Sequence, residues 1–259
     1  MLHFARKGAG PPLLLAHGIG LTHSAFAAVT ERLAADFEVF AVDLPGFGAS
    51  PVVNGPPTMR ALADACAHLM AAEGHDRFHV AGNSLGGGVS LHLALDGRAS
   101  SACALSPVGF AEGWERAYLE FSLWIARAGG GATAALMRGP GRAGAVRRGL
   151  VRQYVEHGDR VPADTMVEAF GGVKAAPGYW STTRHAINWR CPSAAQLPCP
   201  VTVAWGEHDR LLLTGPQSAR ARERLPSARH VTLDDCGHLP AWDDPALVAE
   251  VVRRSAGPL

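Results

Sequence analysis

The chain has 259 residues, 47% of them hydrophobic, and a formal net charge of +1 at neutral pH. This size and apolar content suit one domain, or one domain with an insertion, built around a sizeable core. The near-neutral charge gives no general reason to expect a nucleic-acid or anionic-membrane partner.

The first apolar run, Leu13 to Ala16, follows a few basic residues. It is too short for the core of a signal peptide or for a membrane span, so we expect a cytoplasmic protein with no membrane association. The five cysteines are scattered and include no Cys-X-X-Cys pair. Their odd number and their spacing argue against a disulfide framework or a structural zinc site and predict buried free thiols.

Short apolar runs that end in Gly, Pro, Asp, Asn or Ser are typical of strands buried on both faces of a parallel sheet. Such runs lie in PPLLLAHG, FEVFAVDLPG, RFHVAGNS, ASSACALSP, PVTVAWGEHD and ARHVTLDDCGH. Helical patterns separate them, such as MRALADACAHLMAAEG, which Thr58 can cap and Gly74 can end. This alternation predicts an α/β fold with a mostly parallel, doubly wound sheet.

The region from Pro107 to Ala186 breaks the alternation, because its sequence contains no clear strand pattern. WERAYLEFSLWIARA and AGAVRRGLVRQYVEHG have helical patterns, and we expect the glycine-rich GGGA and GPGRAG stretches to separate the helices. We therefore predict that residues 1–106 and 187–259 form the α/β core and that residues 107–186 form a helical insertion.

Ser84 stands in the stretch Gly82-Asn83-Ser84-Leu85-Gly86, after a strand pattern and before a helical pattern. So sharp a turn strains the central residue, exposes its hydroxyl and leaves no room for side chains at the flanking glycines. The dipole and the free N–H groups of the following helix point at the same place, where they can hold an oxyanion. A plain glycine-rich turn is the alternative, and the strand-turn-helix context favours a nucleophile.

A serine hydroxyl is a weak nucleophile that needs a base, and the base needs an acid to orient it. Asp209 follows the apolar run VTVAW, and His238 follows the run HVTL. Both side chains are therefore expected at the carboxyl ends of parallel strands, where Ser84 is also expected and where open α/β sheets place their sites.

Other acidic residues are alternatives for the orienting acid. Glu207, Asp234 and Asp235 lie in the same two loops, and the position directly after a strand favours Asp209.

These motifs together resemble the α/β-hydrolase superfamily over nearly the whole chain. The resemblance is to its capped serine-hydrolase branch, which includes carboxylesterases and hydrolases of meta-cleavage products. It implies an α/β-hydrolase fold in which residues 107–186 are the cap, or lid. Four motifs carry it: His17-Gly18-Ile19-Gly20, Asp43 to Ser50, the Gly82 to Gly86 elbow, and the paired Asp209 and Gly237-His238 loops.

By this resemblance Ser84 is the nucleophile, His238 the base and Asp209 the acid of a catalytic triad. His238 would take the Ser84 proton during attack and return it to the leaving group, while Asp209 holds the imidazole in the required tautomer. The resemblance implies no metal and no organic cofactor.

The same resemblance assigns the oxyanion hole to two backbone N–H groups, those of Ile19 and Leu85. His17 and Gly18 would support the loop that aims the Ile19 amide. Two such preorganised donors stabilise the charge that develops on the carbonyl oxygen.

A serine at the elbow excludes relatives that attack with a carboxylate or a thiol. The leading hypothesis is a serine hydrolase that acts through an acyl-enzyme on a small-molecule ester, as a carboxylesterase does. The alternative is C–C bond hydrolysis of a vinylogous diketone, because Asn83 and Trp242 resemble substrate-pocket positions of meta-cleavage-product hydrolases. A second alternative is a non-catalytic ligand-binding protein on this fold. The expected partner is a small-molecule substrate, and the protein is expected to be a monomer or a homodimer.

The expected cap is rich in arginine and tryptophan. Seven arginines lie between Arg127 and Arg160, and such a run usually marks a solvated helix face. The alternative is that one or two of them bind a substrate carboxylate or phosphate. For Trp114, Trp124 and Trp180 we expect core packing, with the lining of an apolar pocket as the alternative.

Overall fold

The computed structural model describes residues 1–257. Its seven-stranded sheet has the order β1-β3-β2-β4-β5-β6-β7, and neighbouring strands from β3 to β7 pair in parallel. The predicted α/β class and mostly parallel sheet are confirmed. The parallel strands are β2 (Pro12–Ala16), β3 (Glu38–Val42), β4 (Phe78–Asn83), β5 (Ala99–Leu105), β6 (Val201–Gly206) and β7 (Arg229–Leu233), all in the predicted runs.

The strand β1 (Phe4–Lys7) has no counterpart in the sequence-based prediction. It pairs antiparallel with β3 at the edge of the sheet. Its sequence, FARK, is mostly exposed, so it lacks the apolar run by which the other strands were predicted. Backbone pairing to β3 rather than burial of side chains defines this strand.

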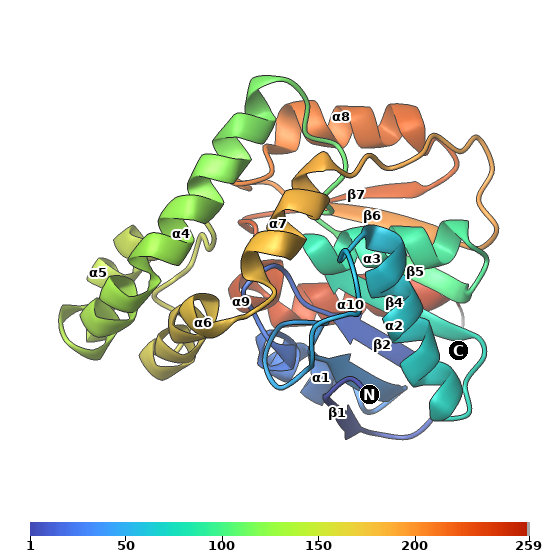
Figure 1. Ribbon diagram of the computed structural model, residues 1–259, viewed down its shortest axis with the longest axis horizontal. Helices are drawn as coiled ribbons and strands as arrows, with labels where there is room; N and C mark the ends of the chain where they lie inside the picture. Colours follow the sequence, from blue (N-terminus) through green and yellow to red (C-terminus); the bar gives the residue numbers. More distant parts are fainter. Residues whose placement is uncertain (258–259) are drawn as a thin grey trace.

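Helices cover both faces of the sheet (Figure 1). Successive strand side chains point to opposite faces, so Leu13 and Leu15 pack in one core cluster and Leu14 and Ala16 in the other. This explains why the strand sequences are continuous apolar runs. On one face lie α2 (Met59–Ala72), α3 (Leu85–Leu95) and α8 (Thr214–Arg224), and on the other α1 (Ala27–Leu33) and α10 (Pro245–Ala256).

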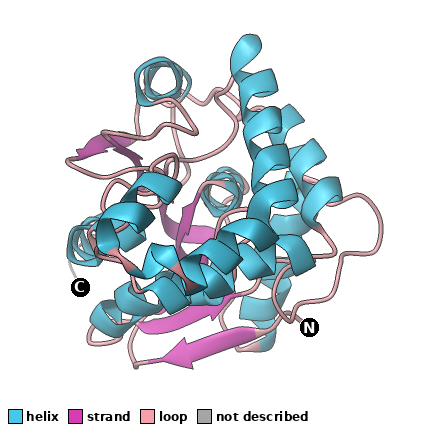
Figure 2. Cartoon of the chain, turned by 90° about the vertical axis from the view of Figure 1, so that its left-hand side faces the viewer, coloured by secondary structure: helices cyan, strands magenta, loops and turns pink. Residues whose placement is uncertain are grey.

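A further group of helices lies between β5 and β6 in the sequence, and most of them project beyond the sheet at the left of Figure 1. Seen from that side, in Figure 2, they cross in front of the strands. They are α4 (Trp114–Arg138), η2 (Pro140–Arg142), α5 (Gly144–Val151), α6 (Ala163–Ala175) and α7 (Tyr179–Asn188). We call this group the cap helices. The division into core and cap stays a prediction, and α7 continues past its expected boundary at Ala186.

The expectation that GGGA separates two helices is wrong, because α4 runs through Gly129, Gly130 and Gly131. Glycine is a poor helix former, but here it permits close packing of α4 against α6. A Cβ atom at Gly130 would lie 2.8 Å from the backbone oxygen of Phe170 on α6. The contact between the helices therefore outweighs the local preference of the sequence.

The five cysteines are free, and four of them are buried, as predicted. Within residues 1–257, no helix combines the length and the apolar character needed to cross a membrane.

Candidate active site

Ser84 occupies the sharp turn between β4 and α3, with φ of 57° and ψ of −110°. This positive φ is unusual for a residue with a side chain and strains the backbone. The flanking glycines are required by contacts: a Cβ atom at Gly82 would lie 2.3 Å from the Gly86 oxygen, and one at Gly86 would lie 2.0 Å from the Ala16 oxygen. The predicted elbow geometry is therefore present at Ser84.

Asp209 and His238 form a buried pair at the carboxyl ends of β6 and β7. His238 Nδ1 lies 2.8 Å from Asp209 Oδ2. The other oxygen, Oδ1, accepts hydrogen bonds from the N–H groups of Leu211 and Leu212, each at 2.9 Å, which fix the carboxylate. With its Nδ1–H donated to Asp209, the neutral His238 ring has a lone pair on Nε2.

The other candidates for the orienting acid lie elsewhere. Asp235 binds His157 Nε2 at 2.6 Å, and Glu207 accepts a hydrogen bond from the Asp235 N–H at 3.0 Å. Among residues 1–257, neither carboxylate is hydrogen-bonded to His238. Of the predicted alternatives, Asp209 is the acid whose carboxylate meets the His238 ring.

Ser84 and His238 both line one cavity beneath the cap helices. No hydrogen bond joins Ser84 Oγ to His238 Nε2 in the part of the chain that the structure describes. Such bonds are often long in unliganded enzymes and shorten when substrate binds. The rest of the lining is mainly apolar and comes from the cap helices and from the loops that follow the strands, including Leu21, Leu123, Val151, Phe170, Val173 and Leu239.

Two backbone N–H groups lie beside Ser84 without a hydrogen-bond partner among residues 1–257, those of Ile19 and Leu85. Leu85 is the first residue of α3, so its N–H belongs to the positive end of the helix dipole. The loop that carries Ile19 touches the elbow, because a Cβ atom at Gly18 would lie 3.3 Å from Ser84 Cβ.

His17 fixes the orientation of the Gly18–Ile19 peptide. Its Nε2 accepts the Leu44 N–H at 2.9 Å, so its Nδ1 carries the proton and donates to the Gly18 oxygen at 2.7 Å. In a trans peptide the C=O and the following N–H point in opposite directions. Holding the Gly18 oxygen therefore also directs the Ile19 N–H.

Burial lowers the pKa of His17 to about 4 and so keeps the ring neutral in the folded protein. In the unfolded chain the pKa returns to about 6.5, so the unfolded state binds a proton that the folded state does not. The contribution of His17 to stability is complete above pH 6.5 and decreases as the pH falls towards 4, by about 3 kcal/mol over that window. We predict that unfolding measured in urea has a steeper pH dependence for the wild type than for His17→Gln.

The control is His68→Gln, which removes an exposed histidine. Equal pH slopes for the wild type and His17→Gln would contradict the assignment of a neutral, buried ring.

The two residues predicted to line the substrate pocket have different positions. Trp242 lines the cavity, and its Nε1–H donates to the Ala25 oxygen at 3.1 Å. Asn83 does not border the cavity that contains Ser84. Its amide nitrogen donates to the backbone oxygens of Leu105 at 3.1 Å and His238 at 2.9 Å. Asn83 therefore ties the elbow to the loop that carries His238.

Asp243 is a buried residue of α9 (Pro240–Asp243) that the sequence analysis missed. Its carboxylate accepts the N–H of Gly237 at 2.7 Å, which precedes His238, and the N–H groups of His157 at 2.6 Å and Glu156 at 3.2 Å. Burial raises the pKa of Asp243 despite these bonds. This carboxylate joins the His238 loop to the segment after α5, and no sequence pattern distinguishes it from its neighbours.

The arginines between Arg127 and Arg160 do not border the cavity in the described chain. Arg147 is buried and donates to four backbone oxygens, those of Gly141, Arg142, Gly158 and Asp159. Arg148, Arg152 and Arg210 all face the carboxylate of Glu156. Arg147, Arg148 and Arg152 therefore make contacts within residues 107–186, and Arg210, which follows β6, links Glu156 to the loop after that strand.

The expectation that Trp114, Trp124 and Trp180 pack in the core is wrong. They are exposed to 66%, 54% and 46% and do not line the cavity. Phe121 stacks on Trp124 on the same exposed side of α4.

A family model described as the alpha/beta hydrolase family matches residues 13–251. The chain therefore belongs to the alpha/beta hydrolase family, as its motifs predict, and the protein is a hydrolase.

The chain is similar to proteins of known and unknown activity. An uncharacterized protein of Mycobacterium tuberculosis is 26% identical over an alignment 275 residues long, gaps included. The alignment covers 97% of this chain and 76% of that protein. A pimeloyl-acyl-carrier-protein methyl ester esterase of Chromobacterium violaceum is 46% identical over 87 residues, 34% of this chain and 32% of that enzyme. A thermophilic esterase from Thermogutta terrifontis, whose structure is solved, is 25% identical with a TM-score of 0.72 over 98% of this chain and 92% of its own.

Proposed function

We propose that this hydrolase is a serine esterase that cleaves a small-molecule carboxylic ester through an acyl-enzyme. The observation that carries the proposal is that Ser84, at a strained elbow, shares one cavity with a His238 ring that is bonded to Asp209. The similarity to two esterases supports the same reaction.

In the proposed reaction Ser84 Oγ attacks the carbonyl carbon while its proton passes to His238 Nε2. The carbonyl oxygen becomes an oxyanion that accepts hydrogen bonds from the Ile19 and Leu85 N–H groups. The carbonyl then re-forms, the C–O bond to the alcohol breaks, and the alkoxide takes the proton from His238. A water molecule next gives a proton to His238 and attacks the acyl-enzyme. When this second oxyanion collapses, the bond between Ser84 Oγ and the acyl carbon breaks, the acid leaves, and His238 returns the proton to Oγ.

The cavity lining supports a neutral, partly apolar substrate. Apart from Ser84 and His238 its side chains are aliphatic and aromatic, and no arginine or lysine borders it in the described residues. An ester with a short or medium acyl chain meets these conditions, because its acyl group gains from apolar contacts and it needs no counter-charge.

C–C hydrolysis of a vinylogous diketone is the second candidate, favoured by the presence of Trp242 in the cavity. Its dienoate substrate carries a carboxylate that needs a cation or several hydrogen-bond donors when it is buried. The arginines that could serve are engaged with backbone oxygens and with Glu156. The lining therefore favours the ester.

We predict that the purified protein hydrolyses short or medium acyl p-nitrophenyl esters at least about a hundredfold faster, in kcat/KM, than it cleaves a 2-hydroxy-6-oxo-dienoate. This ratio equals roughly 2.7 kcal/mol in transition-state stabilisation. Release of p-nitrophenol and loss of the dienoate absorbance measure the two rates. Comparable rates, or a faster dienoate reaction, would favour C–C hydrolysis, and no turnover of either would favour a ligand-binding protein.

A further inference from the structure

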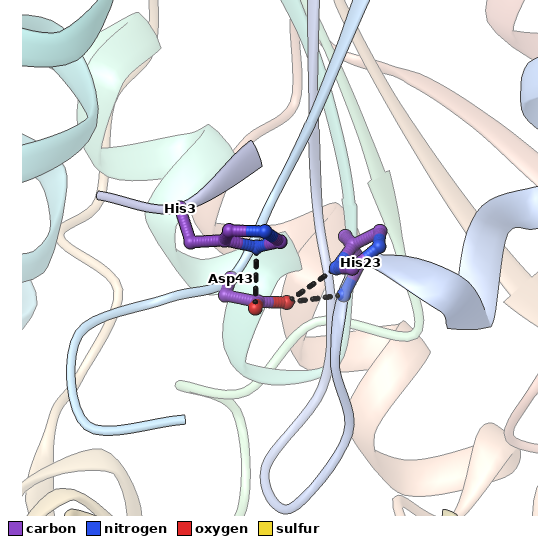
Figure 3. A group of neighbouring side chains, drawn as sticks. All are labelled: His3, His23 and Asp43. Atoms are coloured by element: carbon purple, nitrogen blue, oxygen red, sulfur yellow. Dashed lines mark hydrogen bonds and ion pairs between the residues drawn. The ribbon is translucent and has the colours of Figure 1, made fainter. Parts of the chain in front are cut away.

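Two histidines and one aspartate meet outside the active site (Figure 3). His3 precedes β1, His23 begins η1 (His23–Phe26), and Asp43 follows β3. His3 Nδ1 lies 3.0 Å from Asp43 Oδ2, and His23 Nδ1 lies 2.8 Å from Asp43 Oδ1. One potential ligand atom from each residue lies within 4.8 Å of the other two.

The Asp43 carboxylate is fixed by bonds that do not involve the two rings. The N–H of His23 donates to Oδ1 at 2.8 Å, and the N–H of Ala49 donates to Oδ2 at 3.0 Å. A Cβ atom at Gly48 would lie 2.2 Å from Oδ2, so the loop closes tightly around the carboxylate. The Asp43 carboxylate is therefore already oriented before an ion binds.

The backbone of His3 is fixed as well. Its N–H donates to Ser50 Oγ at 2.8 Å, and the same hydroxyl donates to the backbone oxygen of Asp43 at 2.6 Å. The Asp43 N–H in turn donates to the His3 oxygen at 2.9 Å. The rings remain open to solvent, since the side chains of His3 and His23 are 47% and 30% exposed, against 2% for Asp43. An ion can therefore enter from the ring side.

We propose that His3, His23 and Asp43 form a binding site for a divalent transition-metal ion, for which Zn²⁺ is the best match. Two imidazole nitrogens and a carboxylate are ligands that zinc prefers, whereas Ca²⁺ and Mg²⁺ prefer oxygen alone. The site is separate from the cavity that contains Ser84.

The two nitrogen–oxygen distances are close to those of a zinc site, and the two ring nitrogens lie within 4.8 Å of each other. Zinc binds nitrogen and oxygen at about 2.0–2.2 Å, so ligands of one tetrahedral ion lie roughly 3.3 Å apart. The two nitrogen–oxygen distances, 3.0 and 2.8 Å, are shorter by a few tenths of an ångström. Outward movement of the two partly exposed rings opens this space. Each neutral ring then carries its proton on Nε2 and offers its Nδ1 lone pair to the ion.

Other histidines of this chain show what distinguishes the cluster. His75 binds Glu38 at 3.1 Å, and His157 binds Asp235 at 2.6 Å, each as a pair of one ring and one carboxylate. Within residues 1–257, the cluster of His3, His23 and Asp43 is the group in which three potential ligands come together. His75 is therefore a matched control.

The test is a zinc titration of the 259-residue protein without substrate. Binding is measured by calorimetry or by competition with a chromophoric chelator. We expect one ion per chain at this site and a binding constant at least tenfold weaker for His3→Ala and for His23→Ala. His75→Ala should bind as the wild type does. Zinc should also raise the Tm of the wild type and of His75→Ala, and raise that of the other two variants less.

Two further measurements protect this test against a misfolded variant. His3→Gln and His23→Gln keep the backbone bonds and the approximate side-chain size, and they should lose binding as the alanine variants do. Co²⁺ in place of zinc should give visible absorption bands in the wild type that both glutamine variants lack. Unchanged zinc affinity in the His3 and His23 variants, or no saturable binding by the wild type, would overturn the proposal. Neither result bears on the esterase proposal, because the ion does not touch Ser84.

Discussion

Ser84→Ala is expected to lower the kcat for ester hydrolysis by about 10⁵-fold or more and to leave the chain folded. Alanine cannot form the acyl-enzyme, and the two N–H donors and the cavity by themselves supply only a small part of the rate enhancement. The strained backbone at φ 57° belongs to the turn between β4 and α3, and alanine tolerates it about as well as serine does. Initial rates with a p-nitrophenyl ester, together with thermal unfolding, measure both effects.

Covalent labelling gives an independent measurement. A fluorophosphonate probe should modify the wild type once, at Ser84, and should not modify Ser84→Ala. The matched control is Ser106→Ala, because Ser106 is also buried and follows a strand with positive φ, 41°, but does not border the cavity. Labelling that persists in Ser84→Ala, or that disappears in Ser106→Ala, would refute the assignment of the nucleophile.

Asp209→Asn is expected to lower kcat by about 10³- to 10⁴-fold with little change in KM. The asparagine oxygen can still accept the Leu211 and Leu212 N–H groups, as Asp209 Oδ1 does. Its NH₂ group then faces His238 Nδ1, where Asp209 Oδ2 now lies at 2.8 Å. The ring is driven to the tautomer with its proton on Nε2, which cannot accept the Ser84 proton.

Asp235→Asn is the control for this effect. Asp235 lies in the same loop as His238 but pairs with His157, so its replacement should change kcat by no more than a few-fold. If instead Asp235→Asn were the damaging substitution and Asp209→Asn remained active, the orienting acid would have been wrongly assigned.

The features that the sequence predicts well are those set by local chemistry. A run such as Leu13 to Ala16 is apolar at every position because both faces of the sheet are covered. The glycines around Ser84 reflect contacts within the turn itself and with the adjacent strand. Such signals lie within a few residues and can be recognised without the rest of the fold.

The features that the sequence does not predict depend on distant partners. β1 is defined by pairing with β3, and Gly130 lies within the helix α4 where α6 packs closely against it. Asp243 is buried because three N–H groups from two separate segments converge on it. The cap arginines bind backbone oxygens and the Glu156 carboxylate, which come near them only in the folded chain.

The position of the cap helices in the sequence has a consequence for folding. β5 and β6 are neighbours in the sheet, with Ala102 opposite Val201, although residues 106–200 lie between the two strands. Pairing β5 with β6 carries the entropic cost of closing a long loop. The pair therefore forms through contacts that are distant in sequence and slow to form. Asp209 and His238 follow β6 and β7, so a nascent chain that ends before β6 contains the Ser84 elbow but neither of these partners. Under the proposed mechanism, hydrolytic activity therefore reports the joining of the two halves of the sheet rather than the folding of either half.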